Sequence, residues 1–175
     1  MFEIFRSIIK YFSTDPSDSW NPEISLNLLF DLENRRLNGI GFGESYNSLK
    51  VFGKPTNEKP LYNRVFNFQS LGLLFEIDER ENLDFFSLVF QNEEHENFYS
   101  SKASLKFPNS REFQITRETT NSEISANFGD PKEIDRDDEE IVLFYYLFDL
   151  NIEFELNLKE NLKRMNVMPD LKKAK

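Results

Sequence analysis

The stretch Phe52-Gly53-Lys54-Pro55 has a near copy in Phe128-Gly129-Asp130-Pro131, 76 residues further along the chain. In each copy a glycine follows a phenylalanine, and a proline comes two positions after the glycine. Glycine readily adopts the left-handed conformation that ends a helix, and proline cannot continue one. Both stretches therefore predict the end of a short helix.

A second pair of similar stretches lies downstream of these helix ends. Leu71-x-Leu73-x-Phe75-Glu76-Ile77 matches Leu150-x-Ile152-x-Phe154-Glu155-Leu156, at a spacing of 79 residues. The alternation of apolar with other residues is typical of a half-buried β-strand. Two pairs at nearly the same spacing predict a duplicated structural unit, with about three residues inserted between them in the second copy.

The pattern predicts the same order of elements in both copies: two strands, a helix and three further strands. The connections between the last three strands are short enough for antiparallel hairpins. In the first copy the expected elements are 24–32, 37–42, helix 43–52, 62–68, 71–78 and 83–90, and in the second 103–107, 113–116, helix 118–128, 141–148, 150–158 and 162–168.

The predicted fold class is therefore α+β, with two tandem β-β-α-β-β-β units whose antiparallel sheets carry the helices on one face. An amphipathic helix with apolar residues at helical spacing is expected before them, at positions 1–12. The expected organisation is helix and linker at 1–20, unit one at 21–98 and unit two at 99–175, forming one body. Whether the two sheets join edge to edge stays open.

The charge of the chain restricts its partners. A net charge of −10 and a pI near 4.7 give an acidic surface, which repels phosphate backbones, so no nucleic-acid partner is expected. The same charge suits a basic protein, such as a toxin or nuclease whose substrate groove the surface could fill. The alternative is that the acidity only keeps a chain with 19 phenylalanines soluble.

Few residue types in this chain are of the kind that carries out catalysis. The chain has no cysteine, and His95, its one histidine, lies in a polar stretch between the two units. Thiol chemistry and zinc–thiolate sites are therefore excluded, and we expect no catalytic residue, metal or cofactor. The absence of cysteine, of a signal peptide and of a membrane span favours a cytoplasmic location.

The strand at 141–148 departs most from the duplicated pattern. Alignment with the first unit turns Tyr145 and Leu147 toward the helix, so their neighbours point to the opposite face. That face of an antiparallel sheet is ordinarily wet. It would carry three aromatic side chains, which favour protein interfaces: Phe144, Tyr146 and Phe148. The alternative is that the N-terminal helix or linker covers them.

Acidic residues surround this aromatic group. Glu153 and Glu155 on the next strand are expected on the same face. The acidic run 135–140 contains Asp137 and Asp138, but it lacks the glycine and spaced glutamate of a calcium-binding EF-hand loop. We interpret these four carboxylates as an acidic border for a basic partner.

A helix ending in Phe-Gly-x-Pro, followed by an antiparallel meander with a Leu-x-Phe-Glu strand, resembles the repeat of the β-lactamase inhibitor protein family. It is also similar to the outer-membrane assembly lipoproteins of the SmpA/OmlA type. The resemblance covers roughly residues 24–168 and implies a concave sheet that grips another protein. The inhibitor is secreted and carries disulfides, and the lipoproteins need a lipidated cysteine. This chain has no cysteine, so the target does not carry over.

These observations favour a non-enzymatic protein-binding module, in its most concrete form a bacterial cytoplasmic immunity or inhibitor protein that occludes a toxin or enzyme. Two alternatives stay open. One is a structural or assembly module that associates with itself through the aromatic strand, which makes the chain a homo-oligomer. The other is a hydrolase that uses two carboxylates, although no pair stands out in the sequence.

Overall fold

The computed structural model describes residues 14–21, 26–94, 96–99 and 101–170. The predicted amphipathic helix at 1–12 and His95 lie outside the described residues, as do the last five residues of the chain.

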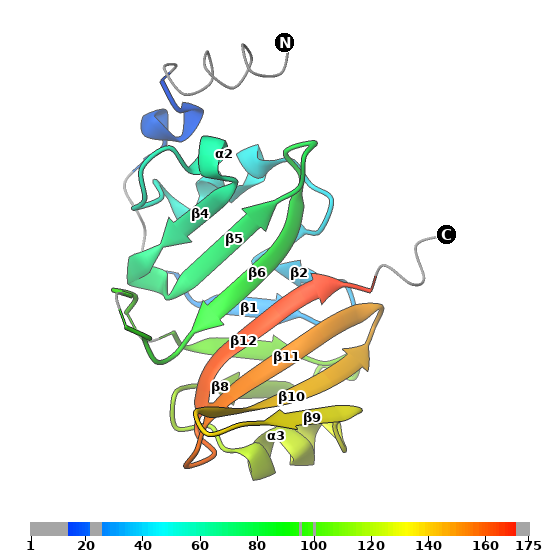
Figure 1. Cartoon of the computed structure of the whole chain (residues 1–175). Helices are drawn as coiled ribbons and strands as arrows, with labels where there is room; N and C mark the ends of the chain where they lie inside the picture. The colour runs from blue at the N-terminus through cyan, green and yellow to red at the C-terminus, as the bar shows by residue number, and fades with distance from the viewer. Residues whose placement is uncertain (1–13, 22–25, 95, 100, 171–175) are drawn as a thin grey trace.

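Seven strands form one antiparallel sheet (Figure 1), in the order β4-β5-β6-β12-β11-β10-β9. Every neighbouring pair in it runs antiparallel. The strands are β4 (Val65–Phe68), β5 (Leu73–Ile77), β6 (Leu83–Val89), β9 (Glu133–Arg136), β10 (Glu140–Leu147), β11 (Leu150–Asn157) and β12 (Leu162–Pro169).

The contact between β6 and β12 answers the question that the sequence left open. These two strands pair directly, with Leu88 opposite Met165 and Phe86 opposite Val167. The last strands of the two predicted units therefore join edge to edge, and the meanders form one continuous sheet. The predicted domain boundaries at residues 20 and 98 stay predictions.

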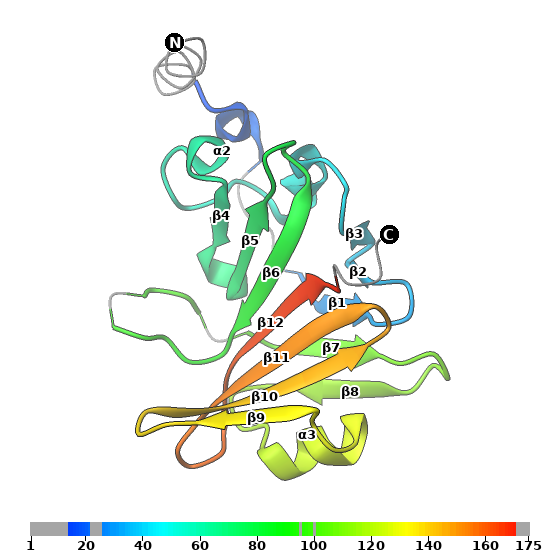
Figure 2. The ribbon, with the colours of Figure 1, turned by 45° about the vertical axis from the view of Figure 1, so that its right-hand side comes forward.

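A second sheet packs behind the first (Figures 1 and 2). Its strand order is β3-β2-β1-β7-β8. The expectation of purely antiparallel sheets is wrong here, because β1 and β7 run parallel. Parallel neighbours need a long connection, and the chain from 32 to 102 supplies it. The strands are β1 (Leu28–Asp31), β2 (Arg36–Leu37), β3 (Ile40–Gly41), β7 (Ala103–Lys106) and β8 (Glu112–Ile115).

Both predicted helix ends are present. Gly53 and Gly129 have positive φ angles of 89° and 80° and follow the last helical residue. The helix before Gly129 begins with a capping box in which Thr120 and Glu123 bond to each other's backbone. The helix before Gly53 is a 3₁₀-helix. The helical segments are η1 (Pro16–Ser19), η2 (Tyr46–Phe52), α2 (Pro60–Asn63), η3 (Gln69–Leu71) and α3 (Asn121–Phe128).

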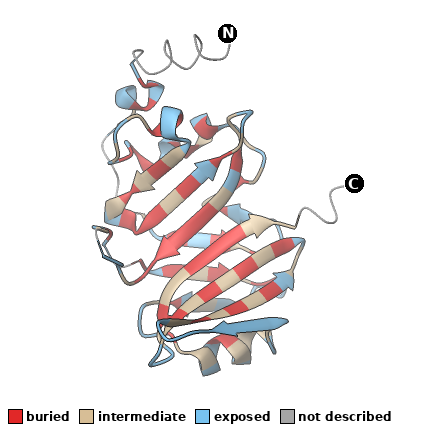
Figure 3. Cartoon of the chain, in the orientation of Figure 1, coloured by how far each residue is buried: buried red, intermediate tan, exposed pale blue. Residues whose placement is uncertain are grey.

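The core lies between the two sheets and is rich in aromatic contacts. Phe30 of the five-stranded sheet meets Phe86 of the seven-stranded sheet edge to face, with ring centroids 4.9 Å apart. Phe52 at the end of η2 packs on Phe75, and Phe128 at the end of α3 packs on Phe154. Both helices thus contact the same face of the seven-stranded sheet. Figure 3 shows the resulting alternation of buried and partly exposed residues along β10 and β11.

Candidate protein-binding face

The seven-stranded sheet has one face toward the core and one away from it. Figures 1 and 2 show no described helix or strand in front of the second face. We call it the open face. Strand alternation and register place the following side chains on it: Asn67, Leu74, Glu76, Phe85, Ser87, Glu133, Asp135, Glu140, Val142, Phe144, Tyr146, Asn151, Glu153, Glu155, Arg164 and Asn166.

Two of the three predicted aromatic residues lie on the open face. Leu143 and Tyr145 are buried, so their neighbours Phe144 and Tyr146 point the other way. Phe144 is half-buried and stands opposite Glu153, while Tyr146 is 45% exposed. The structure therefore places these two rings beside the predicted carboxylates.

The prediction that Phe148 shares this face is wrong. The strand β10 ends at Leu147, and Phe148 and Asp149 form the two-residue turn into β11. Both turn residues have positive φ, 56° and 57°, as the tight hairpin turn of type I′ requires. The ring of Phe148 packs against the hydrophobic core instead. Sequence alternation missed this because it carries no information on where a strand turns.

The acidic run spans the end of β9, the β9–β10 turn and the first residue of β10, and Asp137 and Asp138 lie in the turn. The Asp137 carboxylate accepts hydrogen bonds from the backbone N–H groups of Glu139 and Glu140, both at 2.8 Å. These two bonds lower the pKa of Asp137 below its usual range. Asp138 is exposed in the same turn. Asp137 thus shapes the turn, and only Asp138 extends freely at this end of the open face.

Glu155 is the most enclosed of the predicted carboxylates. Its side chain is 18% exposed, and it accepts a hydrogen bond of 2.5 Å from Asn166 Nδ2. Arg164 Nε lies 3.6 Å from Glu155 Oε2. Burial raises the pKa of Glu155, and the positive charge of Arg164 offsets this only in part.

Arg164 is held mainly by a different acid. Its guanidinium donates to Glu96 Oε1 at 2.6 Å, closer than its contact with Glu155. Burial alone lowers the pKa of Arg164, but the bond to Glu96 and its charge outweigh burial and raise it. The pKa values of the two partners therefore have different main causes: ion pairs raise the pKa of Arg164, whereas burial raises the pKa of Glu155.

A bulge in the β11–β12 pairing brings Lys163 beside Arg164 on the open-face side. The Lys163 ammonium contacts Glu140 at 2.5 Å and Glu93 at 3.3 Å. The polar segment after β6, which the sequence predicted only as a link, is therefore anchored on β12 through Glu93 and Glu96.

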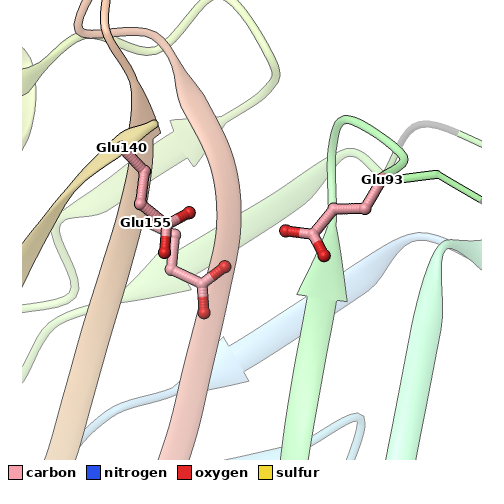
Figure 4. Close-up of side chains that lie close together, drawn as sticks. All are labelled: Glu93, Glu140 and Glu155. Atoms are coloured by element: carbon pink, nitrogen blue, oxygen red, sulfur yellow. The ribbon is translucent and has the colours of Figure 1, made fainter. Parts of the chain in front are cut away.

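Three carboxylates in this area are close enough to share a cation. Oxygens of Glu93, Glu140 and Glu155 lie within 4.8 Å of one another (Figure 4). The ammonium of Lys163 already contacts two of them and supplies the positive charge that they need. We therefore assign this group as an ion-pair network and not as a metal centre.

Four buried side-chain oxygens have no hydrogen-bond partner within the described part of the chain. All four belong to residues of the open face: Asn67, Ser87, Asn151 and Asn166. Buried polar atoms are almost always paired, and an unpaired one costs about 1–3 kcal/mol. Within the described residues, this cost in stability is therefore confined to the open face.

The sequence reasoning missed several residues of this face. Phe85 lies there, opposite Glu76, so the first unit also contributes an aromatic ring. Ser87 and Asn166 are 79 residues apart, the spacing of the duplicated strands, and they stand opposite each other in the β6–β12 pair. The equal spacing is visible in the sequence. It indicates a contact between Ser87 and Asn166 only once β6 is known to pair with β12.

Two shallow clefts lie away from these residues. One, of about 400 Å³, follows the β1–β7–β8 region, and the other, of about 410 Å³, lies where the β2–β3 hairpin meets the ends of β6 and β12. The second is lined by Arg35, Arg36, Asp84 and Asp149 among others, so acidic and basic groups mix there. Neither cleft includes Phe144, Tyr146 or Glu153.

No family model matches this chain, and a search of curated proteins gives no match. Among solved structures, the chain is similar to a DUF4309 family protein, YjgB of Bacillus subtilis, with a TM-score of 0.52 and 12% identity. The similarity covers 76% of this chain and 84% of that one. At this identity it shows a common fold alone. None of the described helices is both long enough and apolar enough to cross a membrane.

Proposed function

We propose that this protein is a non-enzymatic binding module whose open face occludes a basic partner protein, as a cytoplasmic immunity or inhibitor protein does. The observation that carries the proposal is the open face itself: a broad sheet surface with partly exposed rings and with carboxylates that have no partner among the described residues. Exposed apolar surface with a polar border is a common mark of a protein-binding site.

The charges support a basic partner. Glu133, Asp135 and Glu153 on the open face make no ion pair with any described residue. Carboxylates that have no cation beside them give this face a negative electrostatic potential, which attracts a positively charged protein and speeds its association. Phe144 stands between Glu133 and Glu153, and Tyr146 lies on the same face opposite Asn151. The two rings supply apolar area for an interface.

We further propose that the fold consists of two tandem units, and that duplication widened the binding surface. The helix ends at Gly53 and Gly129 and the pairing of Ser87 with Asn166 support this interpretation. One unit provides a three-stranded meander, and the joined meanders provide the width that a protein partner needs. A standard interface buries about 800 Å² on each side.

The proposal is tested by affinity capture from cells of the native organism, with quantitative mass spectrometry. Tyr146→Glu places a charge on the exposed ring position of the proposed interface and should reduce capture of the partner at least tenfold. The matched control is Val51→Glu, because Val51 is similarly exposed, at 43%, but lies on η2. Equal capture of every protein by the wild type and both variants contradicts the proposal.

A second candidate is self-association, and the edge strand β9 favours it. All four of its residues are exposed, and Ile134 is 58% exposed. An unpaired edge invites pairing with another copy, although the charges of Glu133 and Arg136 oppose it. Light scattering after size exclusion distinguishes the two: a stable dimer that Ile134→Lys converts to a monomer supports assembly, and a wild-type monomer contradicts it.

A further inference from the structure

The two ends of the seven-stranded sheet differ in how their outward backbone groups are paired. At the β4 end, the side chain of Asn57 bonds to the edge twice: its Oδ1 accepts from the Asn67 N–H at 2.9 Å, and its Nδ2 donates to the Val65 carbonyl at 2.8 Å. The Thr56 N–H donates to the Asn67 carbonyl at 2.7 Å. These bonds take the place of a further strand, so the β4 edge is closed to another chain.

The β9 end has no such cover within the described residues. β9 is the last strand there (Figure 2), and all four of its residues are exposed. The Asp137 N–H donates to the Glu140 carbonyl at 3.1 Å, and hydrogen-bonded pairs alternate along an antiparallel ladder. Asp135 therefore bonds to β10, whereas the N–H and C=O groups of Ile134 and Arg136 point outward. No described residue bonds to these outward groups.

The side chains of β9 define the kind of strand that this edge accepts. Glu133 and Asp135 lie on the open face and have no ion pair with any described residue. Ile134 and Arg136 alternate with them and lie on the other face. A strand added antiparallel to β9 would face Glu133 and Asp135 in non-hydrogen-bonded pairs, in which the Cα atoms are only about 4.5 Å apart. A basic residue opposite each acid is therefore favoured.

A second copy of β9 fits this edge badly. Identical chains ordinarily pair about a two-fold axis, which makes the two edge strands antiparallel. The registers that join the outward groups place this axis at Ile134, Asp135 or Arg136. Each register sets acid against acid on the open face: Glu133 against Asp135, Asp135 against its own copy, or Asp135 against Asp137. Like charges directly opposite each other destabilise a strand pair, so the edge favours a strand from another protein.

We propose that the edge of β9 binds an extended segment of the partner protein as an eighth strand of the sheet. The segment carries a basic residue opposite Glu133, an apolar residue opposite Ile134 and a basic residue opposite Asp135. This inference rests on the proposed function and names the element, and the kind of segment, through which a basic partner engages this sheet. Main-chain bonds to Ile134 and Arg136 supply affinity, and the alternating side chains supply selectivity.

The probe for this edge is the acetylated and amidated peptide Thr-Lys-Val-Lys-Val-Thr, titrated into the ¹⁵N-labelled full chain and followed by NMR. We expect the backbone amide signals of Ile134 and Arg136 to shift with saturation in the millimolar range, and their hydrogen exchange to slow at least threefold. Two control peptides should give no saturating shift. Thr-Glu-Val-Glu-Val-Thr has the opposite charges, and the basic peptide N-methylated at its first valine lacks the donor for the Ile134 carbonyl.

Three variants complete the test. Ile134→Pro removes an outward N–H, leaves the ladder to β10 intact and should abolish saturable binding of the basic peptide. Asp135→Asn keeps the shape of the side chain and should weaken binding at least threefold. Glu112→Gln, on an exposed residue of β8, is the charge-matched control and should bind like the wild type. The absence of a saturating shift at Ile134 and Arg136, equal shifts with the N-methylated peptide, or unchanged binding in Asp135→Asn overturns the inference.

The capture experiment separates this inference from the proposed function. Loss of the partner in Tyr146→Glu with full capture by Ile134→Pro leaves the binding function supported and overturns the edge site. Saturable binding of the basic peptide at β9, without any partner whose capture depends on Tyr146, supports the edge site and contradicts the occlusion proposal. If hydrogen exchange at Ile134 and Arg136 slows with rising protein concentration and no peptide, β9 pairs with its own copy and the inference is overturned.

Discussion

At the scale of single residues, the clearest electrostatic feature is Asp31 at the end of β1. Its carboxylate accepts hydrogen bonds from the backbone N–H of Asn34 at 3.0 Å and from Lys106 at 2.9 Å. The bond from the Asn34 backbone, followed by that from Lys106, lowers the pKa of Asp31 to about 2. Lys106 is the residue opposite Asp31 in the parallel β1–β7 pair, so this acid links the two halves of the chain.

Replacing Asp31 tests this link. The pKa is lower in the folded state, so its stabilisation is complete above about pH 4 and is lost as the pH falls through about 2. We expect Asp31→Asn to lower the free energy of unfolding by on the order of 1 kcal/mol at pH 7, after allowance for solvent screening. Urea unfolding should show this difference shrink between pH 4 and pH 2.

The control for that measurement is Glu79→Gln. Glu79 makes only a long contact of 3.8 Å with Arg64, and its side chain is 89% exposed. Exposed pairs contribute little to stability. A loss in Glu79→Gln as large as that in Asp31→Asn contradicts the role assigned to Asp31.

Glu155 gives the opposite pH dependence. Burial raises its pKa above the usual 4.5, so the folded state becomes less stable as the pH rises through the folded pKa. Glu155→Gln removes this titration, while Arg164 keeps its bond to Glu96. We expect the stability of the variant relative to the wild type to rise between pH 4.5 and pH 7. A relative fall over that range contradicts the dominance of burial.

At the scale of elements, the sequence predicted what depends on local pattern. The Gly-x-Pro stops marked the ends of η2 and α3, and apolar alternation located β5, β6 and the long strands β10 to β12 within a few residues. It missed β9, because Glu-Ile-Asp-Arg has no buried residue to set an alternation. It also missed the parallel pairing of β1 with β7, which depends on contacts between distant parts of the chain.

The candidate site was predictable to a similar extent. Alternation sufficed to place Phe144, Tyr146, Glu153 and Glu155 on one face. It failed for Phe148, whose side is decided by the turn. It also could not show that Arg164 pairs with Glu155 while Glu153 has no partner among the described residues, since both glutamates have the same local pattern.

Among the connections between elements, Gly72 is the position with the strictest requirement for glycine. Its φ is +61°, and a Cβ there would clash with the carbonyl of Tyr99 and lie 2.7 Å from that of Val89. The Gly72 carbonyl also accepts from Val89 N–H at 2.8 Å, so the chain after β6 packs directly on this turn. We expect Gly72→Ala to lower the free energy of unfolding by about 3 kcal/mol, which is measured as a lower midpoint of thermal unfolding.

Gly39→Ala is the matched control for Gly72→Ala. Gly39 also has a positive φ, +87°, but a Cβ there would meet no atom within 4 Å. Gly39→Ala should therefore lower the free energy of unfolding only through the strained backbone conformation, by about 1 kcal/mol. Equal losses in the two variants, measured by calorimetry, contradict the close packing assigned to Gly72.

At the scale of the whole molecule, two sheets enclose one aromatic core and leave one broad face uncovered by the described elements (Figures 1 and 2). The direct pairing of β6 with β12 makes that face continuous across both halves. The open face combines apolar rings, unpaired acids and unpaired oxygens. Our central claim is that a basic protein covers it.

Site-specific photo-cross-linking in the native organism tests this claim most directly. p-Benzoylphenylalanine is introduced in place of Tyr146 on the open face, and in place of Val51 on η2 as the control. Our account predicts one discrete cross-linked protein from position 146, none from position 51, and loss of the adduct when Glu153→Lys is added. No adduct at position 146, or the same adducts from both positions, would contradict it.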